Sequence, residues 1–135
     1  MIGLVVATHG TLGEAMLDTV AMIIGRPVHT RAVSLSRDRD PLELRDQLTE
    51  AICEVGTDDD GVLVAVDMFG GTPANIGMTL LEPGRVELLT GVNLPMLIKF
   101  FTYRERMALP ELAELLKGYA RDGIVLGSAV LPRQF

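Results

Sequence analysis

Three short segments of the sequence carry the residue types that could do chemistry. Residues 8–10 (Thr-His-Gly), 67–75 (Asp-Met-Phe-Gly-Gly-Thr-Pro-Ala-Asn) and 91–95 (Gly-Val-Asn-Leu-Pro) each follow an apolar run. A carboxylate beside a histidine accepts a hydrogen bond from one ring nitrogen, which leaves the other nitrogen as a nucleophile with a free lone pair. His9 and Asp67 can form such a pair if the strands that precede them are neighbours.

The residues around this pair are typical of an anion pocket. Gly10, Gly70 and Gly71 allow backbone N–H groups to approach a ligand closely. Helices predicted to begin near Thr11 and Thr72 would point their N-termini at the same place, and free N–H groups at a helix start bind anions. A nucleophilic imidazole in an anion pocket suits phosphoryl transfer.

Each of these signals is weak when it is taken alone. A single histidine at a strand end is more often structural or solvated than catalytic, Asp67 could be a turn or capping residue, and two adjacent glycines usually form a tight turn. The coincidence of three segments favours a chemical role for His9. His29 lies within a predicted strand and has no carboxylate or glycine nearby in the sequence, so it is expected to be structural.

The alternation of apolar patterns indicates the scaffold that must position these segments. β-Branched apolar runs predict strands over 2–7, 28–35, 61–66, 85–90 and 124–131. Helical periodicity, with start signals at Asp40-Pro41 and Thr72-Pro73, predicts helices over 12–24, 41–55, 73–81, 96–101 and 110–120. Thr72 would be the N-cap of the third helix. The pattern favours one α/β domain over 1–135, with a doubly wound, mostly parallel sheet and helices on both faces. In such sheets ligands gather at the carboxyl ends of the strands.

Composition limits the classes of function. The net charge is −6 and the basic residues are scattered, which argues against a nucleic-acid surface. The N-terminus lacks a signal-peptide pattern, and no apolar run approaches the roughly 20 residues of a membrane span, so a cytoplasmic protein without membrane insertion is expected. We expect no metal and no cofactor, a solvated turn at 58–60, and a packing role for the single cysteine, Cys53.

The three segments resemble those of a known family. Residues 7–10 (Ala-Thr-His-Gly), 66–75 (Val-Asp-Met-Phe-Gly-Gly-Thr-Pro-Ala-Asn) and 91–97 (Gly-Val-Asn-Leu-Pro-Met-Leu) are similar, in order and spacing, to the IIA component of the mannose/fructose/sorbose class of the bacterial phosphoenolpyruvate-dependent sugar phosphotransferase system. The resemblance covers essentially the whole chain. It implies a phosphotransferase that accepts a phosphoryl group from the histidine-containing phosphocarrier protein and passes it to a IIB component.

The resemblance also implies roles for individual residues. His9 would carry the phosphoryl group on Nε2, and Asp67 would hold the Nδ1–H group. Thr72 would bind the phosphoryl oxygens, assisted by backbone groups near Gly10 and Gly71. The family further suggests a homodimer in which the last strand, here about 124–131, is exchanged between the two copies. Some relatives fuse IIA to IIB, whereas this chain is expected to use a separate IIB partner.

Two functions remain open from the sequence. The chain is either a phosphocarrier on the path to a sugar or a phosphorylation-dependent regulatory module that binds another protein, because both need the same site. A nucleotide-binding domain is disfavoured by the absence of the two common glycine-rich phosphate motifs. A histidine phosphatase is disfavoured because Thr8, and not arginine, precedes His9.

Overall fold

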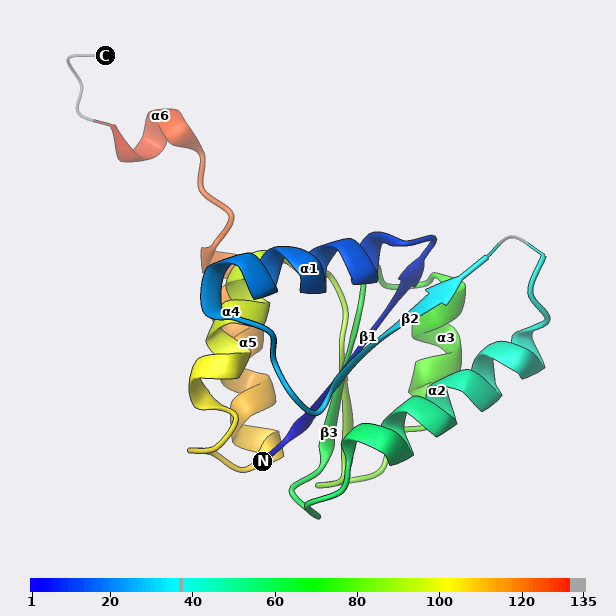
Figure 1. The fold of residues 1–135 in the computed structure, drawn as a ribbon. Helices are drawn as coiled ribbons and strands as arrows, with labels where there is room; N and C mark the ends of the chain where they lie inside the picture. The colour runs from blue at the N-terminus through cyan, green and yellow to red at the C-terminus, as the bar shows by residue number, and fades with distance from the viewer. Residues whose placement is uncertain (37, 132–135) are drawn as a thin grey trace.

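Four parallel strands form the centre of the molecule (Figure 1). The computed structural model describes residues 1–36 and 38–131. The strands are β1 (Gly3–His9), β2 (Thr30–Leu35), β3 (Val62–Val66) and β4 (Val86–Leu89), in the order β2-β1-β3-β4, and every neighbouring pair is parallel. The α/β prediction is therefore confirmed, and β1 lies between β2 and β3.

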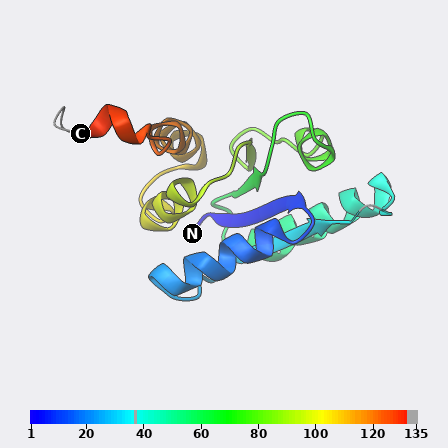
Figure 2. The same cartoon turned by 90° about the horizontal axis from the view of Figure 1, so that it is seen from above.

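Helices cover both faces of this sheet (Figure 2). One face packs against α1 (Leu12–Ile24), α4 (Leu94–Tyr103) and α5 (Leu109–Asp122), and the other packs against α2 (Pro41–Val55) and α3 (Thr72–Met78). Side chains of a strand alternate between the two faces. Leu4 and Val6 of β1 accordingly join the first core, and Val5 and Ala7 join the second.

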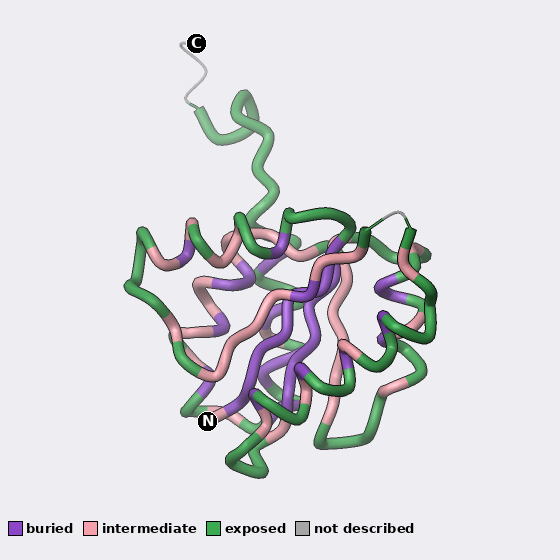
Figure 3. The backbone as a smooth tube through the Cα atoms, turned by 45° about the vertical axis from the view of Figure 1, so that its right-hand side comes forward, coloured by how far each residue is buried: buried purple, intermediate pink, exposed green. Residues whose placement is uncertain are grey.

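The two central strands are buried almost throughout (Figure 3). Their near-continuous apolar runs are what a strand covered on both faces requires. Two local expectations were wrong: Cys53 is exposed on α2, and α3 ends at Met78 and not at residue 81. Among the described residues, no helix has the length and apolar character needed to cross a membrane.

The predicted last strand over 124–131 is not a strand in the structure. Residues 124–126 have no regular structure, and α6 (Gly127–Val130) is a single helical turn closed by a bond from the Leu131 N–H to the Gly127 oxygen. The segment projects away from the body of the protein (Figure 1). A strand is stabilised by hydrogen bonds to a neighbouring strand, and in this position the segment meets no sheet edge of its own chain.

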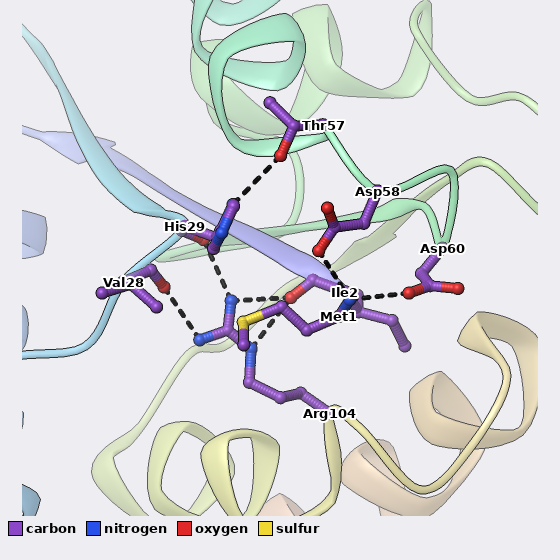
Figure 4. A network of polar contacts seen from close by, with 8 residues as sticks. All are labelled: Met1, Ile2, Val28, His29, Thr57, Asp58, Asp60 and Arg104. Atoms are coloured by element: carbon purple, nitrogen blue, oxygen red, sulfur yellow. Dashed lines mark hydrogen bonds and ion pairs between the residues drawn. The ribbon is translucent and has the colours of Figure 1, made fainter.

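A buried arginine joins the amino ends of the strands to α4 (Figure 4). The Arg104 side chain donates hydrogen bonds to the carbonyl oxygens of Ile2, at 2.9 and 2.7 Å, of Val28, at 2.9 Å, and of His29, at 3.1 Å. Arg104 is only 6% exposed, and burial lowers the pKa of its guanidinium group. These contacts lie at the end of the sheet opposite to His9.

Candidate functional site

The sheet brings His9 and Asp67 together at the carboxyl ends of adjacent strands. His9 is the last residue of β1, and Asp67 directly follows β3. The register pairs Ala7 with Val66, so that both chains emerge from the sheet at the same level. The position of the two residues therefore follows from the parallel pairing of β1 with β3.

The carboxylate of Asp67 contacts both the ring and the backbone of His9. Its Oδ2 lies 2.8 Å from Nδ1 of the ring and 3.0 Å from the backbone N of the same residue. Its Oδ1 accepts a bond from the Met68 N–H at 3.0 Å. The Asp67 side chain is 14% exposed and the His9 side chain is 48% exposed, so the carboxylate is enclosed while the ring faces solvent.

These contacts decide the charge of the carboxyl group and the tautomer of the ring. Burial acts to raise the pKa of Asp67, but the hydrogen bonds from the ring and backbone of His9 outweigh it and hold that pKa below its usual value. An ionised carboxylate can only accept, so Nδ1 must donate. In the neutral ring Nε2 then carries the lone pair, at the atom away from Asp67.

The lowered pKa predicts how the stability of the protein depends on pH. A carboxyl group whose pKa is lower in the folded state stabilises the fold above its unfolded pKa of about 3.9, and this contribution is lost as the pH falls through the folded-state pKa. We expect Asp67→Asn to be less stable than the wild type at neutral pH, with a difference that shrinks below about pH 4.

Urea unfolding at a series of pH values checks this expectation. Asp46→Asn, which changes an exposed carboxylate on α2, is the matched control and should follow the wild-type curve. A difference between Asp67→Asn and the wild type that stays constant with pH would show that the contact with His9 does not carry it.

Gly71 lies against the imidazole ring because it has no side chain. A β-carbon at residue 71 would lie 2.8 Å from Cε1 and 3.5 Å from Nε2 of His9. Gly71 is also the N-cap of α3, which begins at Thr72, so the prediction that Thr72 is the cap was wrong. The close packing of the Gly71 backbone on His9 places the start of α3, and with it Thr72, beside the ring.

The turn from β1 into α1 depends on Thr8 and Gly10. The buried Thr8 hydroxyl accepts the Gly13 N–H at 2.8 Å, whereas Thr11, the N-cap, makes no side-chain capping bond. Gly10 has a φ of 55°, a conformation that glycine adopts readily. Its N–H is donated to the Leu35 oxygen at 2.8 Å, so this amide is already paired.

A cavity of about 550 Å³ opens beside His9. Its walls come from the ends of β1 and β2, the start of α3 and the loop between β2 and α2; they are His9, Gly10, Leu35, Ser36, Arg39, Pro41 and Thr72. The sequence prediction missed Ser36 and Arg39. Both lie in the loop after β2, and the rule that located the other loops applies to it as well, because β2 is a neighbour of β1.

The third predicted segment lies at the same edge of the sheet but not at His9. Gly91 and Asn93 line a different cavity, between the end of β4 and α5. Asn93 caps α4 by accepting the Met96 N–H at 3.0 Å, and its amide group donates to the Ala120 oxygen at 3.0 Å. Residues 91–95 therefore join α4 to α5 and do not line the cavity of His9.

Comparison with protein families gives one matching model, described as PTS system fructose IIA component, over residues 3–117. Among characterised proteins, the chain is 29% identical over 134 residues to the PTS system fructose-specific EIIA component of Bacillus subtilis, which covers 98% of this chain and 91% of that protein. It is 27% identical over 125 residues to the PTS system mannose-specific EIIAB component of Escherichia coli, covering 91% of this chain and 38% of that longer protein.

Solved structures show the same fold. The EIIA component from Streptococcus agalactiae superposes with a TM-score of 0.86 at 23% identity, covering 96% of this chain and 99% of that one. The mannose/sorbose-specific IIA subunit from Enterococcus faecalis superposes with a TM-score of 0.83 at 25% identity, covering 98% of this chain and 97% of that one.

Proposed function

The chain belongs to the family of PTS fructose IIA components, and on that premise we propose that His9 is the residue that carries the phosphoryl group. A phosphocarrier of this family acts in sugar uptake between a phosphorylated donor protein and a IIB component. The observation that carries the assignment to His9 is its 2.8 Å contact from Nδ1 to Asp67, which leaves Nε2 with a lone pair beside an open cavity.

In the proposed transfer, bonds form and break only between the phosphoryl group and the two imidazole rings. The lone pair of Nε2 attacks phosphorus in line with the donor's N–P bond; the new N–P bond forms as the old one breaks, and its electron pair stays with the donor ring. The proton on Nδ1 remains in its hydrogen bond to Asp67. The negative carboxylate stabilises the positive charge that the phosphorylated ring of His9 acquires.

The surroundings of the ring have separate proposed roles. Thr72 would donate its hydroxyl to a phosphoryl oxygen, with backbone groups near Gly71 and beside Gly10 assisting; the N–H of Gly10 itself is paired with Leu35. Met68 and Phe69 are 55% and 76% exposed, and exposed apolar residues next to a reactive site are typical of protein docking. We propose that they meet the histidine-containing phosphocarrier protein in the cytoplasm, and that a separate IIB component receives the phosphoryl group afterwards.

The experiment that tests the function follows phosphate by mass. The protein is mixed with phosphoenolpyruvate, the first enzyme of the system and the phosphocarrier protein, and one phosphoryl group per chain is expected. The label should disappear in acid and persist in base, as an N–P bond does. Omission of the phosphocarrier protein is the control and should prevent labelling. An unlabelled chain in the complete mixture would contradict the carrier function.

We also propose that two copies of this chain associate through residues 124–131. Ile124 is 79% exposed and Leu126 is 72% exposed, which is unusual for apolar residues in series. β4 is an edge strand of the described sheet, and only its first residue, Val86, is bridged to Glu82. A second copy would cover both features at once by strand exchange. Light scattering should give the mass of a dimer for the wild type and of a monomer for Leu126→Asp. Met22→Asp, at an exposed position of α1, should remain dimeric; a monomeric wild type would contradict the proposal.

A further inference from the structure

The loop between β2 and α2 brings an arginine to the cavity of His9. Arg39 lines this cavity and is half-buried. Its backbone N–H bonds to the Ser36 oxygen at 3.3 Å, and the next residue, Asp40, caps α2 by accepting the Leu42 N–H at 3.0 Å. The loop is therefore attached on both sides of Arg39, which holds the base of its side chain at the wall of the cavity.

The charges in the cavity create a need for a cation. A phosphoryl group carries a charge of about −1.5 to −2 at neutral pH, and on His9 it would lie near the ionised carboxylate of Asp67. The backbone N–H of Gly10, which lines the cavity, is already paired with the Leu35 oxygen and does not offset this charge. Among the described residues that line the cavity, Arg39 is the one cationic side chain apart from the histidine itself.

The side chain of Arg39 is available to bind a ligand. Within the described part of the chain, no carboxylate lies at ion-pair distance from its guanidinium group. A guanidinium group presents several N–H donors in one plane and binds phosphate oxygens through two parallel hydrogen bonds. The guanidinium group of Arg39, its position at the cavity of His9 and its positive charge all suit a ligand that carries several anionic oxygens.

We propose that Arg39 binds the phosphoryl group on His9 and stabilises the phosphorylated state of the protein. This inference rests on the proposed function of His9. Its consequence is thermodynamic: Arg39 shifts the exchange of phosphate with the donor protein toward the IIA chain, and it favours the dianionic form of the phosphoryl group.

A structural role for Arg39 is the alternative that the experiment must separate. Arg39 also lines a second cavity, of about 200 Å³, together with Glu14 and Gln47. The Gln47 Oε1 atom is buried and has no hydrogen-bond partner among the described residues. An arginine that served only to satisfy this oxygen would affect the stability of the fold and leave the phosphoryl group unaffected.

The test compares Arg39→Gln, Arg39→Lys and the control Arg45→Gln, which removes an exposed arginine of α2. Three quantities are measured: the equilibrium constant for phosphate exchange with the phosphocarrier protein, the pKa of the phosphoryl group from the phosphorus NMR shift, and the free energy of unfolding in urea. We expect Arg39→Gln to move the equilibrium roughly 10-fold to 100-fold toward the donor and to raise the pKa of the phosphoryl group. Arg39→Lys should be intermediate, and Arg45→Gln should match the wild type.

Two results would overturn the proposal. The first is a phosphorylated Arg39→Gln variant with wild-type exchange and an unchanged phosphorus titration. The second is an Arg39→Gln variant in which only the free energy of unfolding decreases, which would show that Arg39 stabilises the fold, for example at Gln47, and does not bind the phosphoryl group. A wild-type chain that accepts no phosphate would instead contradict the function of His9 itself, so failure of the two proposals can be told apart.

Discussion

Replacement of His9 by asparagine is expected to abolish phosphorylation of this chain, while the same replacement of His29 leaves phosphorylation intact. Loss of a nucleophile that works together with its orienting partner lowers a rate by roughly 10⁴-fold or more. Asparagine has no ring nitrogen to attack phosphorus. Because the His9 side chain is 48% exposed, its removal should leave the fold in place.

His29 offers a matched control because it is the other histidine of the chain. Its backbone has a φ of 50°, a left-handed conformation that asparagine tolerates better than most residues. Its ring nitrogen Nδ1 lies 3.3 Å from the Thr57 hydroxyl, near the amino ends of the strands. The substitution therefore removes an imidazole while it respects the backbone, and any general effect of losing a histidine is controlled.

Mass measurement after incubation with the complete donor system checks this pair of variants. Circular dichroism of both proteins establishes that they are folded. Phosphate that remains on the His9→Asn variant would place the acceptor elsewhere in the chain. Phosphate that disappears from His29→Asn alone would assign the acceptor to the wrong end of the sheet and would refute the site described here.

Arg104→Met is expected to cause a substantial loss of stability. Methionine is of similar length but cannot donate a hydrogen bond. The Ile2 carbonyl oxygen loses both of its guanidinium donors, whereas the Val28 oxygen keeps the Thr30 hydroxyl and the His29 oxygen keeps the Leu4 N–H. A buried polar group left without a hydrogen-bond partner costs about 1–3 kcal/mol. The whole free energy of unfolding of a domain is about 5–15 kcal/mol, so this loss is a substantial fraction of the total.

The experiment on Arg104→Met separates an effect on the stability of the fold from an effect on phosphorylation. Arg106→Met is the matched control, because Arg106 is exposed two residues along the chain and its guanidinium lies 5.8 Å from the centre of the Tyr103 ring. Urea unfolding should show a small change for this control and a large one for Arg104→Met. Where Arg104→Met is still folded, at low temperature, it should accept phosphate normally, since Arg104 and His9 lie at opposite ends of the sheet. A change in unfolding free energy no larger than that of the control would refute the role of Arg104.

Much of the fold could be predicted because the spacing of apolar residues along the chain reflects which faces of a strand or helix are buried. The apolar runs before residues 9 and 67 become the buried strands β1 and β3, and periodicity and start signals located α1 to α5 to within a few residues. The weakest predictions were at the chain's ends and caps. The run over 124–131 has the composition of a strand, but a strand needs a neighbour, and composition does not supply one.

The proximity of His9 and Asp67 was also predictable, for a physical reason. In a parallel sheet the carboxyl ends of adjacent strands meet at one edge, so one assumption about strand order was enough to pair these residues. The same reasoning did not include Arg39, because the loop after the second strand has no histidine or glycine that would have marked it as part of a site. It also placed residues 91–95 too near to His9, because β4, which precedes these residues, is separated from β1 by β3.

The sequence by itself therefore determined the secondary structure before residue 124 apart from helix caps and ends, the parallel α/β class and the identity of the paired histidine and carboxylate. The tertiary structure alone decided the strand order, the wall of the cavity that contains Arg39, and the burial of Arg104 against carbonyls 75 to 102 positions away in the chain. The reason is that periodicity depends on near neighbours along the chain. The partners of a buried charge and the walls of a cavity depend on segments that meet only after folding.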